Sequence, residues 1–147
     1  MNNHGILLQL SKIKEEIQVL VDKCKKLVGA FNHNNVLRKA LHQVQQELAY
    51  SVRIQLQGEC NTRFNYRYTM LDSIVSNEKA LCQMLTNVTI NKGLIGHVPT
   101  TTEFILINDL CNLMFPLQDF ISTIGASNYP TMSFLYPLIY KLENSML

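Results

Sequence analysis

The most regular hydrophobic pattern in the chain lies near its N-terminus. Apolar residues there alternate between spacings of four and three, which places them on one face of a helix with about 3.6 residues per turn. We therefore predict one continuous helix from Ile6 to Phe31. Val21 and Val28 widen its apolar face, which favours packing within the protein's own domain, and docking on a partner helix in a dimer is the alternative. The stripe consists of Ile6, Leu10, Ile13, Ile17, Leu20, Cys24, Leu27 and Phe31.

Other segments also carry apolar residues at helical spacing. A polar run over residues 32–35 follows the first helix and offers an N-cap for the second, so the two should form an antiparallel hairpin. The connection over residues 86–99 contains two glycines and a proline and separates the third helix from the fourth. The further predicted helices cover residues 37–48, 68–85, 104–124 and 130–146.

The fourth predicted helix carries two local signals. Thr100 and Glu103 have the spacing of a capping box, in which the hydroxyl accepts from a free backbone N–H while the carboxylate reaches back. Pro116 should kink the helix, because its ring removes one backbone hydrogen bond and clashes with an earlier carbonyl.

From Tyr50 the pattern changes from helical to alternating. Apolar and polar residues take turns until Gly58, which is typical of a strand, and we predict a short β-strand near residues 50–57. A lone strand leaves its backbone groups unpaired. It would therefore pair with a segment elsewhere, pair with its counterpart in a dimer, or extend the second helix instead.

Length and composition fit one domain. The chain has 147 residues, of which 47% are hydrophobic and 16% charged. We predict a single mainly α domain over residues 1–147, with about five helices in a bundle-like arrangement and one short strand. No apolar run approaches the roughly 18 residues of a membrane span, and the N-terminus lacks the features of a signal peptide. We expect a soluble intracellular protein without a membrane partner.

Charge is distributed unevenly, although the formal net charge is only +2. Residues 1–67 carry ten Lys and Arg against five Asp and Glu, whereas residues 68–147 carry three against six. The basic half could face nucleic acid. Solvent-facing charges on helices are the more ordinary explanation.

Motifs of enzymes and metal sites are missing from the sequence. Cys24, Cys60, Cys82 and Cys111 form no CxxC pair, and the four histidines supply no partner at zinc-finger spacing. The sequence also offers no nucleophile with a base, no phosphate loop and no converging carboxylate pair. We expect reduced cysteines, no catalytic residues, no metal, no cofactor and no small-molecule substrate.

Residues 60–71, CNTRFNYRYTML, resemble a segment of the form TRWNSTYxML in the hAT superfamily of DNA transposases. The helical region from Phe104 onward, with its late Pro130-Thr131 and the run LYPLIYKL, is also similar to that family. Upstream, the long first helix followed by Phe31, Asn32 and the helix that carries Leu37 resembles the family's stretch after its CxxH motif, so the resemblance covers nearly the whole chain. Its matching positions in the first segment are Thr62, Arg63, Asn65, Tyr68, Met70 and Leu71.

The resemblance implies a fold and an origin. The family has a ribonuclease H-like core interrupted by a helical insertion, and it cuts DNA with an Asp/Asp/Glu triad and divalent metal ions. Residues 1–58 would then be a helical hairpin and strand of that core, and residues 59–147 the start of the insertion. The chain would lie between the second Asp and the Glu of the triad, so the resemblance implies a non-catalytic, transposase-derived fragment located in the nucleus.

The resemblance also indicates a nucleic-acid contact. The family's Trp, which can stack on an unpaired base near the active site, is Phe64 here. With Arg63 and Arg67 available for phosphates, we predict weak DNA binding at Arg63, Phe64, Asn65 and Arg67. The alternative is that Phe64 packs under the third helix and Arg63 pairs with an acidic neighbour.

A second function from another class stays open. The stripe of residues 6–31 would serve a helical protein-interaction module, through self-association or with another transposase-like chain.

Overall fold

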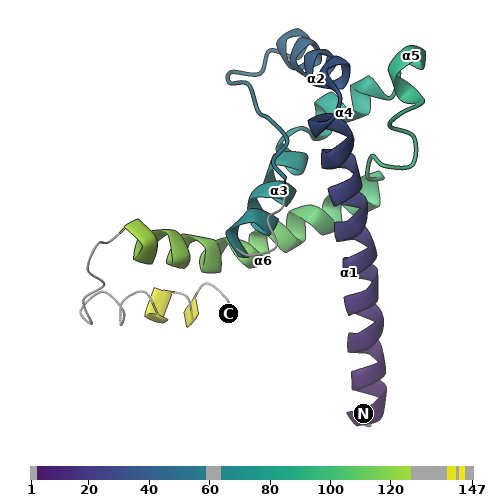
Figure 1. Ribbon diagram of the computed structural model, residues 1–147. Coiled ribbons are helices and arrows are strands. Elements are labelled where there is room, and N and C mark those ends of the chain that lie inside the picture. The colour runs from purple at the N-terminus through teal and green to yellow at the C-terminus, as the bar shows by residue number, and fades with distance from the viewer. Residues whose placement is uncertain (1–2, 59–63, 127–138, 142, 145–147) are drawn as a thin grey trace.

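The computed structural model of the protein describes residues 3–58, 64–126, 139–141 and 143–144. These residues are mainly helical, as the sequence predicts, and the helices meet around one core (Figure 1). Most of the fifth predicted helix, over residues 130–146, lies outside the described residues. The labelled helices are α1 (Asn3–Asn32), α2 (Asn35–Glu47), α3 (Phe64–Ser76), α4 (Glu78–Met84), α5 (Val88–Asn91) and α6 (Thr101–Ala126).

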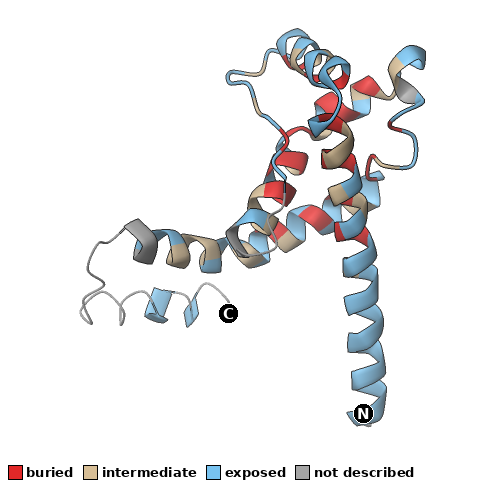
Figure 2. Ribbon diagram, in the orientation of Figure 1, coloured by how far each residue is buried: buried red, intermediate tan, exposed pale blue. Residues whose placement is uncertain are grey.

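The predicted first helix is confirmed, but only part of its apolar stripe is buried. Helix α1 has 30 residues, and at about 1.5 Å per residue it is longer than the core against which it packs. Its N-terminal part, residues 3–16, projects from the body of the molecule and is exposed throughout (Figures 1 and 2). The buried residues of α1 are Leu20, Val21, Cys24, Leu27, Val28 and Phe31.

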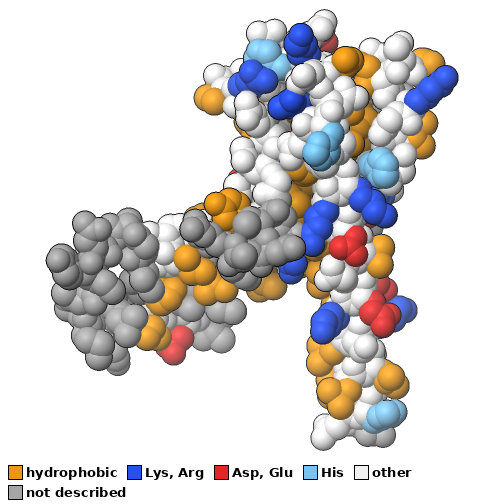
Figure 3. Space-filling model, in the orientation of Figure 1, with side chains coloured by type: hydrophobic (Ala, Val, Ile, Leu, Met, Phe, Trp, Pro, Cys, Tyr) orange, Lys and Arg blue, Asp and Glu red, His pale blue; other side chains and the backbone are white. Residues whose placement is uncertain are grey.

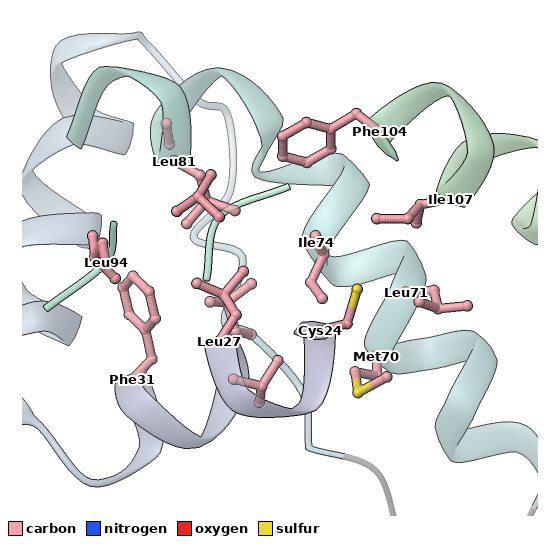
Figure 4. Close-up of a cluster of buried hydrophobic side chains, with 14 of the residues drawn as sticks. Cys24, Leu27, Phe31, Met70, Leu71, Ile74, Leu81, Leu94, Phe104 and Ile107 are labelled. Atoms are coloured by element: carbon pink, nitrogen blue, oxygen red, sulfur yellow. The ribbon is translucent and has the colours of Figure 1, made fainter. Parts of the chain in front are cut away.

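The core is formed where the second half of α1 meets α3, α4 and α6. Helix α3 lies along the first part of α6, and α1 crosses both (Figure 1). The connection between α4 and α6 contributes Leu94, which points toward Phe31 (Figure 4). Figure 4 labels Cys24, Leu27 and Phe31 of α1, Met70, Leu71 and Ile74 of α3, Leu81 of α4, Leu94, and Phe104 and Ile107 of α6.

Helix α2 begins and ends with recognisable caps. The Asn34 side chain accepts hydrogen bonds from the backbone N–H groups of Val36 at 2.9 Å and Leu37 at 3.3 Å, which confirms the predicted N-cap. At the other end, the Tyr50 N–H donates to the Gln45 carbonyl and the Ala49 N–H to the Gln46 carbonyl. This pair of bonds is a Schellman motif.

The predicted β-strand over residues 50–57 is wrong. Among the residues that the structure describes there is no strand, and this segment follows an irregular path over α2 and α3. Side chains from the helices bind its backbone instead: the Ile54 carbonyl accepts from Gln45 Nε2 at 2.8 Å and from Asn77 Nδ2 at 3.3 Å. The Gln57 N–H donates to Ser73 Oγ at 3.1 Å. These side chains supply the hydrogen bonds that the backbone of a neighbouring strand would otherwise supply.

The predicted helix over residues 68–85 is interrupted at Asn77. Helix α3 ends at Ser76 and α4 begins at Glu78. Asn77 is fully buried, and its Nδ2 also donates to the Ser73 carbonyl at 2.9 Å while its Oδ1 accepts from Gln45. An asparagine side chain that competes for backbone groups in this way favours a break in a helix.

The start of α6 shows half of the predicted capping box. The Glu103 N–H donates to Thr100 Oγ1 at 3.3 Å. The Glu103 carboxylate binds Lys23 Nζ instead, at 2.9 and 3.1 Å, and so joins α6 to α1. Further along, α6 continues through Pro116 as one helix.

Ala49 has the left-handed backbone that the Schellman motif requires, with φ of +57°. A methyl group disfavours this conformation and glycine does not, so Ala49→Gly should raise the free energy of unfolding by about 0.5–1 kcal/mol. Urea unfolding measures the change. Ala40→Gly, inside α2, is the matched control and should lower that free energy by about 1 kcal/mol. A loss of stability in Ala49→Gly would contradict the assigned cap.

Candidate interaction surfaces

The predicted nucleic-acid residues lie where the connection after residue 58 enters α3. Arg63 lies outside the described residues, and Phe64 and Asn65 are described only as part of the α3 backbone. Arg67 lies on the first turns of α3 and is partly buried. The structure therefore neither gathers the four side chains into one site nor separates them, and DNA binding there stays a prediction.

The projecting part of α1 carries the most continuous exposed apolar surface of that helix. We call Ile6, Leu7, Leu10 and Ile13 the distal stripe, and their side chains are 38%, 64%, 57% and 51% exposed. Figure 3 shows hydrophobic side chains along this part of the helix, among a few charged ones. Four of the predicted stripe positions, from Leu20 onward, are buried in the core. Ile6, Leu10 and Ile13 continue the same seam on the exposed part of the helix, and Leu7 lies beside it.

Helix α6 has a second exposed apolar surface. One face of its first turns, with Phe104 and Ile107, is buried in the core, whereas Leu113 and Phe115 are exposed. The Phe115 ring lies 6.3 Å from that of Tyr68. Residues Thr101–Thr123 are long and apolar enough to cross a membrane by length and composition alone. A helix of a protein core also meets that criterion. The absence of a membrane partner therefore stays an expectation from the sequence.

A small cavity lies between α2 and the irregular segment that follows it. Its volume is about 50 Å³, and a cavity needs only about 10–15 Å³ to hold one water. None of its described lining residues is acidic, and two are arginines. The lining residues are Phe31, Asn32, Arg38, Leu41, His42, Gln45, Arg53, Ile54, Gln55 and Leu56.

The cysteines show no sign of chemistry in the described part of the chain. Cys24, Cys82 and Cys111 are free thiols, as predicted, and Cys60 lies outside the described residues. Burial raises the pKa of Cys24 to about 12 and that of Cys111 to about 11, and the nearby carboxylates of Glu103 and Asp72 act in the same direction. Within the same described ranges, no group of His, Cys, Asp and Glu is arranged to hold a metal ion.

Comparison of the chain with protein-family models, curated proteins and solved structures gave no match. The resemblance to hAT transposases therefore has no support beyond the residues that suggested it.

The thiols should differ in reactivity according to their burial. At pH 8 a thiol with a pKa of about 12 is a thiolate in about one molecule in ten thousand, and the thiolate is the reactive form. Iodoacetamide should therefore modify the exposed Cys82 while Cys24 and Cys111 stay protected until the protein is unfolded in urea. Peptide mass spectrometry separates the sites, including Cys60. Equal modification of Cys24 and Cys82 in the folded protein would disprove the packing around α1.

Proposed function

We propose that the protein is a helical protein-interaction module whose docking surface is the distal stripe of α1. The observation that supports this best is the division of one continuous seam into a buried half and an exposed half. Burying a leucine or isoleucine side chain contributes about 1.5–3 kcal/mol, so the exposed half is an unused source of binding free energy. A contiguous apolar surface of this kind is typical of interaction sites.

The partner that fits the distal stripe best is a second copy of the same helix. Spacings of four and three are the seam of a coiled coil, and two identical seams complement each other about a twofold axis. In an antiparallel pair, Leu10 would face Ile13 of the second copy, and Ile6 would face its Ile17.

The charges next to the stripe agree with such pairing. In the antiparallel register, Lys14 would lie beside Leu7 of the second copy and Glu16 beside its Gln9. No two like charges would face each other across the seam, and the Lys14 stem would cover apolar surface. The available helix is short, residues 3–16 spanning about 20 Å at 1.5 Å per residue, so we expect a weak, concentration-dependent dimer.

The hAT-derived origin, the nuclear location and the absence of enzymatic activity stay predictions from the sequence. Weak DNA binding at Arg63, Phe64, Asn65 and Arg67 is likewise a prediction from the sequence. Its support is the motif together with the excess of basic residues over residues 1–67.

Leu10→Asp tests the proposed docking surface. The side chain is exposed, so its replacement should leave the fold intact while placing a charge in the seam of the dimer. Sedimentation velocity over a hundredfold range of concentration should show the wild-type protein shifting from monomer to dimer. The variant should stay a monomer throughout.

Val19→Asp is the matched control. Val19 is 69% exposed on the same helix, about 180° around the axis from Leu10, and the substitution introduces the same charge. The loss of helix propensity is a few tenths of a kcal/mol smaller than in Leu10→Asp, so circular dichroism should show that both variants keep their helix content. Val19→Asp should dimerise like the wild type. A wild-type protein that remains monomeric at every concentration, or equal effects of the two substitutions, would count against the proposal.

A further inference from the structure

The cavity between α2 and residues 53–56 has the donors of a phosphate site. Arg38 and His42 enter it from one side of α2, and Arg53 enters from the segment that passes over that helix. Figure 3 shows Lys, Arg and His side chains gathered over this end of the molecule. Guanidinium groups present several N–H donors in a plane and bind phosphate oxygens in pairs.

The arginines are free to take a ligand. Arg53 is exposed and has no hydrogen bond or ion pair with the residues that the structure describes. Arg38 donates from Nη2 to the Asn35 side chain, a neighbour on the same helix, which orients the guanidinium and leaves its other N–H groups available. Both arginines therefore line the cavity, are exposed, and have N–H donors that are not used in other bonds within the described ranges.

Two of the residues that line the cavity carry a polar atom without a partner among the described residues. His42 Nδ1 and Gln45 Oε1 are buried, and neither has a hydrogen-bond partner in the described part of the chain. Gln45 is only 2% exposed, and its Nε2 is already bound to the Ile54 carbonyl and Asn77. Leaving a buried polar atom unpaired is unfavourable, so an occupant that pairs with both atoms is favoured.

We infer that this cavity binds a phosphate monoester or inorganic phosphate. Its oxygens accept from Arg38, Arg53 and His42, and a protonated phosphate oxygen donates to Gln45 Oε1. A phosphodiester has no P–OH group and cannot make that last bond. Pairing with Gln45 Oε1 thus favours a terminal or free phosphate over the backbone of a nucleic acid.

Isothermal titration of the full chain with inorganic phosphate, at pH 6.5 and constant ionic strength, tests the site. Arg53→Gln removes one set of donors from an exposed position and should weaken binding about tenfold. Lys39→Gln, next to Arg38 but outside the cavity lining, removes the same charge and should bind phosphate as the wild type does. Circular dichroism shows that both variants are folded.

Two further probes separate the sources of phosphate. Dimethyl phosphate, a diester, should bind at least about tenfold more weakly than inorganic phosphate, because Gln45 Oε1 stays unpaired. A single-stranded oligonucleotide should bind at this site more tightly with a 5′-phosphate than without one. No phosphate binding at millimolar concentration, equal losses in Arg53→Gln and Lys39→Gln, or equal binding of the diester would overturn the inference.

Discussion

The fold depends on the burial of Cys24, Leu27 and Phe31 of α1 against α3, α4 and α6. These contacts place one end of a 30-residue helix in the only extensive core of the described residues, and they fix the direction of the other end. Helix propagation is cooperative, so the buried half favours helix in the exposed half, whose amides still open locally because no tertiary contact with the described residues protects them. The Lys23–Glu103 ion pair lies at the border between the two halves and joins α1 to the start of α6. The distal stripe therefore continues along the axis of α1 away from the core.

The path of the chain between α2 and α3 depends on a buried polar cluster rather than on a sheet. Gln45 and Asn77 supply the donors that bind the Ile54 carbonyl, although they lie on either side of it in sequence. The alternating pattern of residues 50–57 predicted a half-buried strand, but of its apolar residues only Leu56 is fully buried and Val52 is 69% exposed. Hydrogen bonds from Gln45 in α2 and from Asn77 between α3 and α4 determine the path of this segment. The asparagine within an otherwise helical pattern was a readable sign of the break at residue 77.

The sequence predicted one of the candidate surfaces, the stripe of α1, but not the cavity beside α2. The spacing of apolar residues predicted the α1 helix and its stripe. It could not predict which part of the stripe is buried, because that depends on the lengths of α3 and α6 and on how they cross α1. The cavity that we propose binds phosphate is lined by Arg38 and Arg53, which come from segments separated by most of α2, so no local sequence motif predicts it. The transposase-like motif lies partly outside the described residues, and its predicted contact with DNA keeps the support it had from the sequence.

Hydrogen–deuterium exchange along α1, followed at low and high protein concentration, tests the division of this helix most directly. Residues 20–31 should exchange slowly at both concentrations, because tertiary contacts protect them. Residues 5–16 should exchange rapidly in dilute solution and slowly in concentrated solution, where a second copy covers the distal stripe. Uniform protection of the whole helix in dilute solution, or rapid exchange of residues 5–16 at both concentrations, would contradict the account.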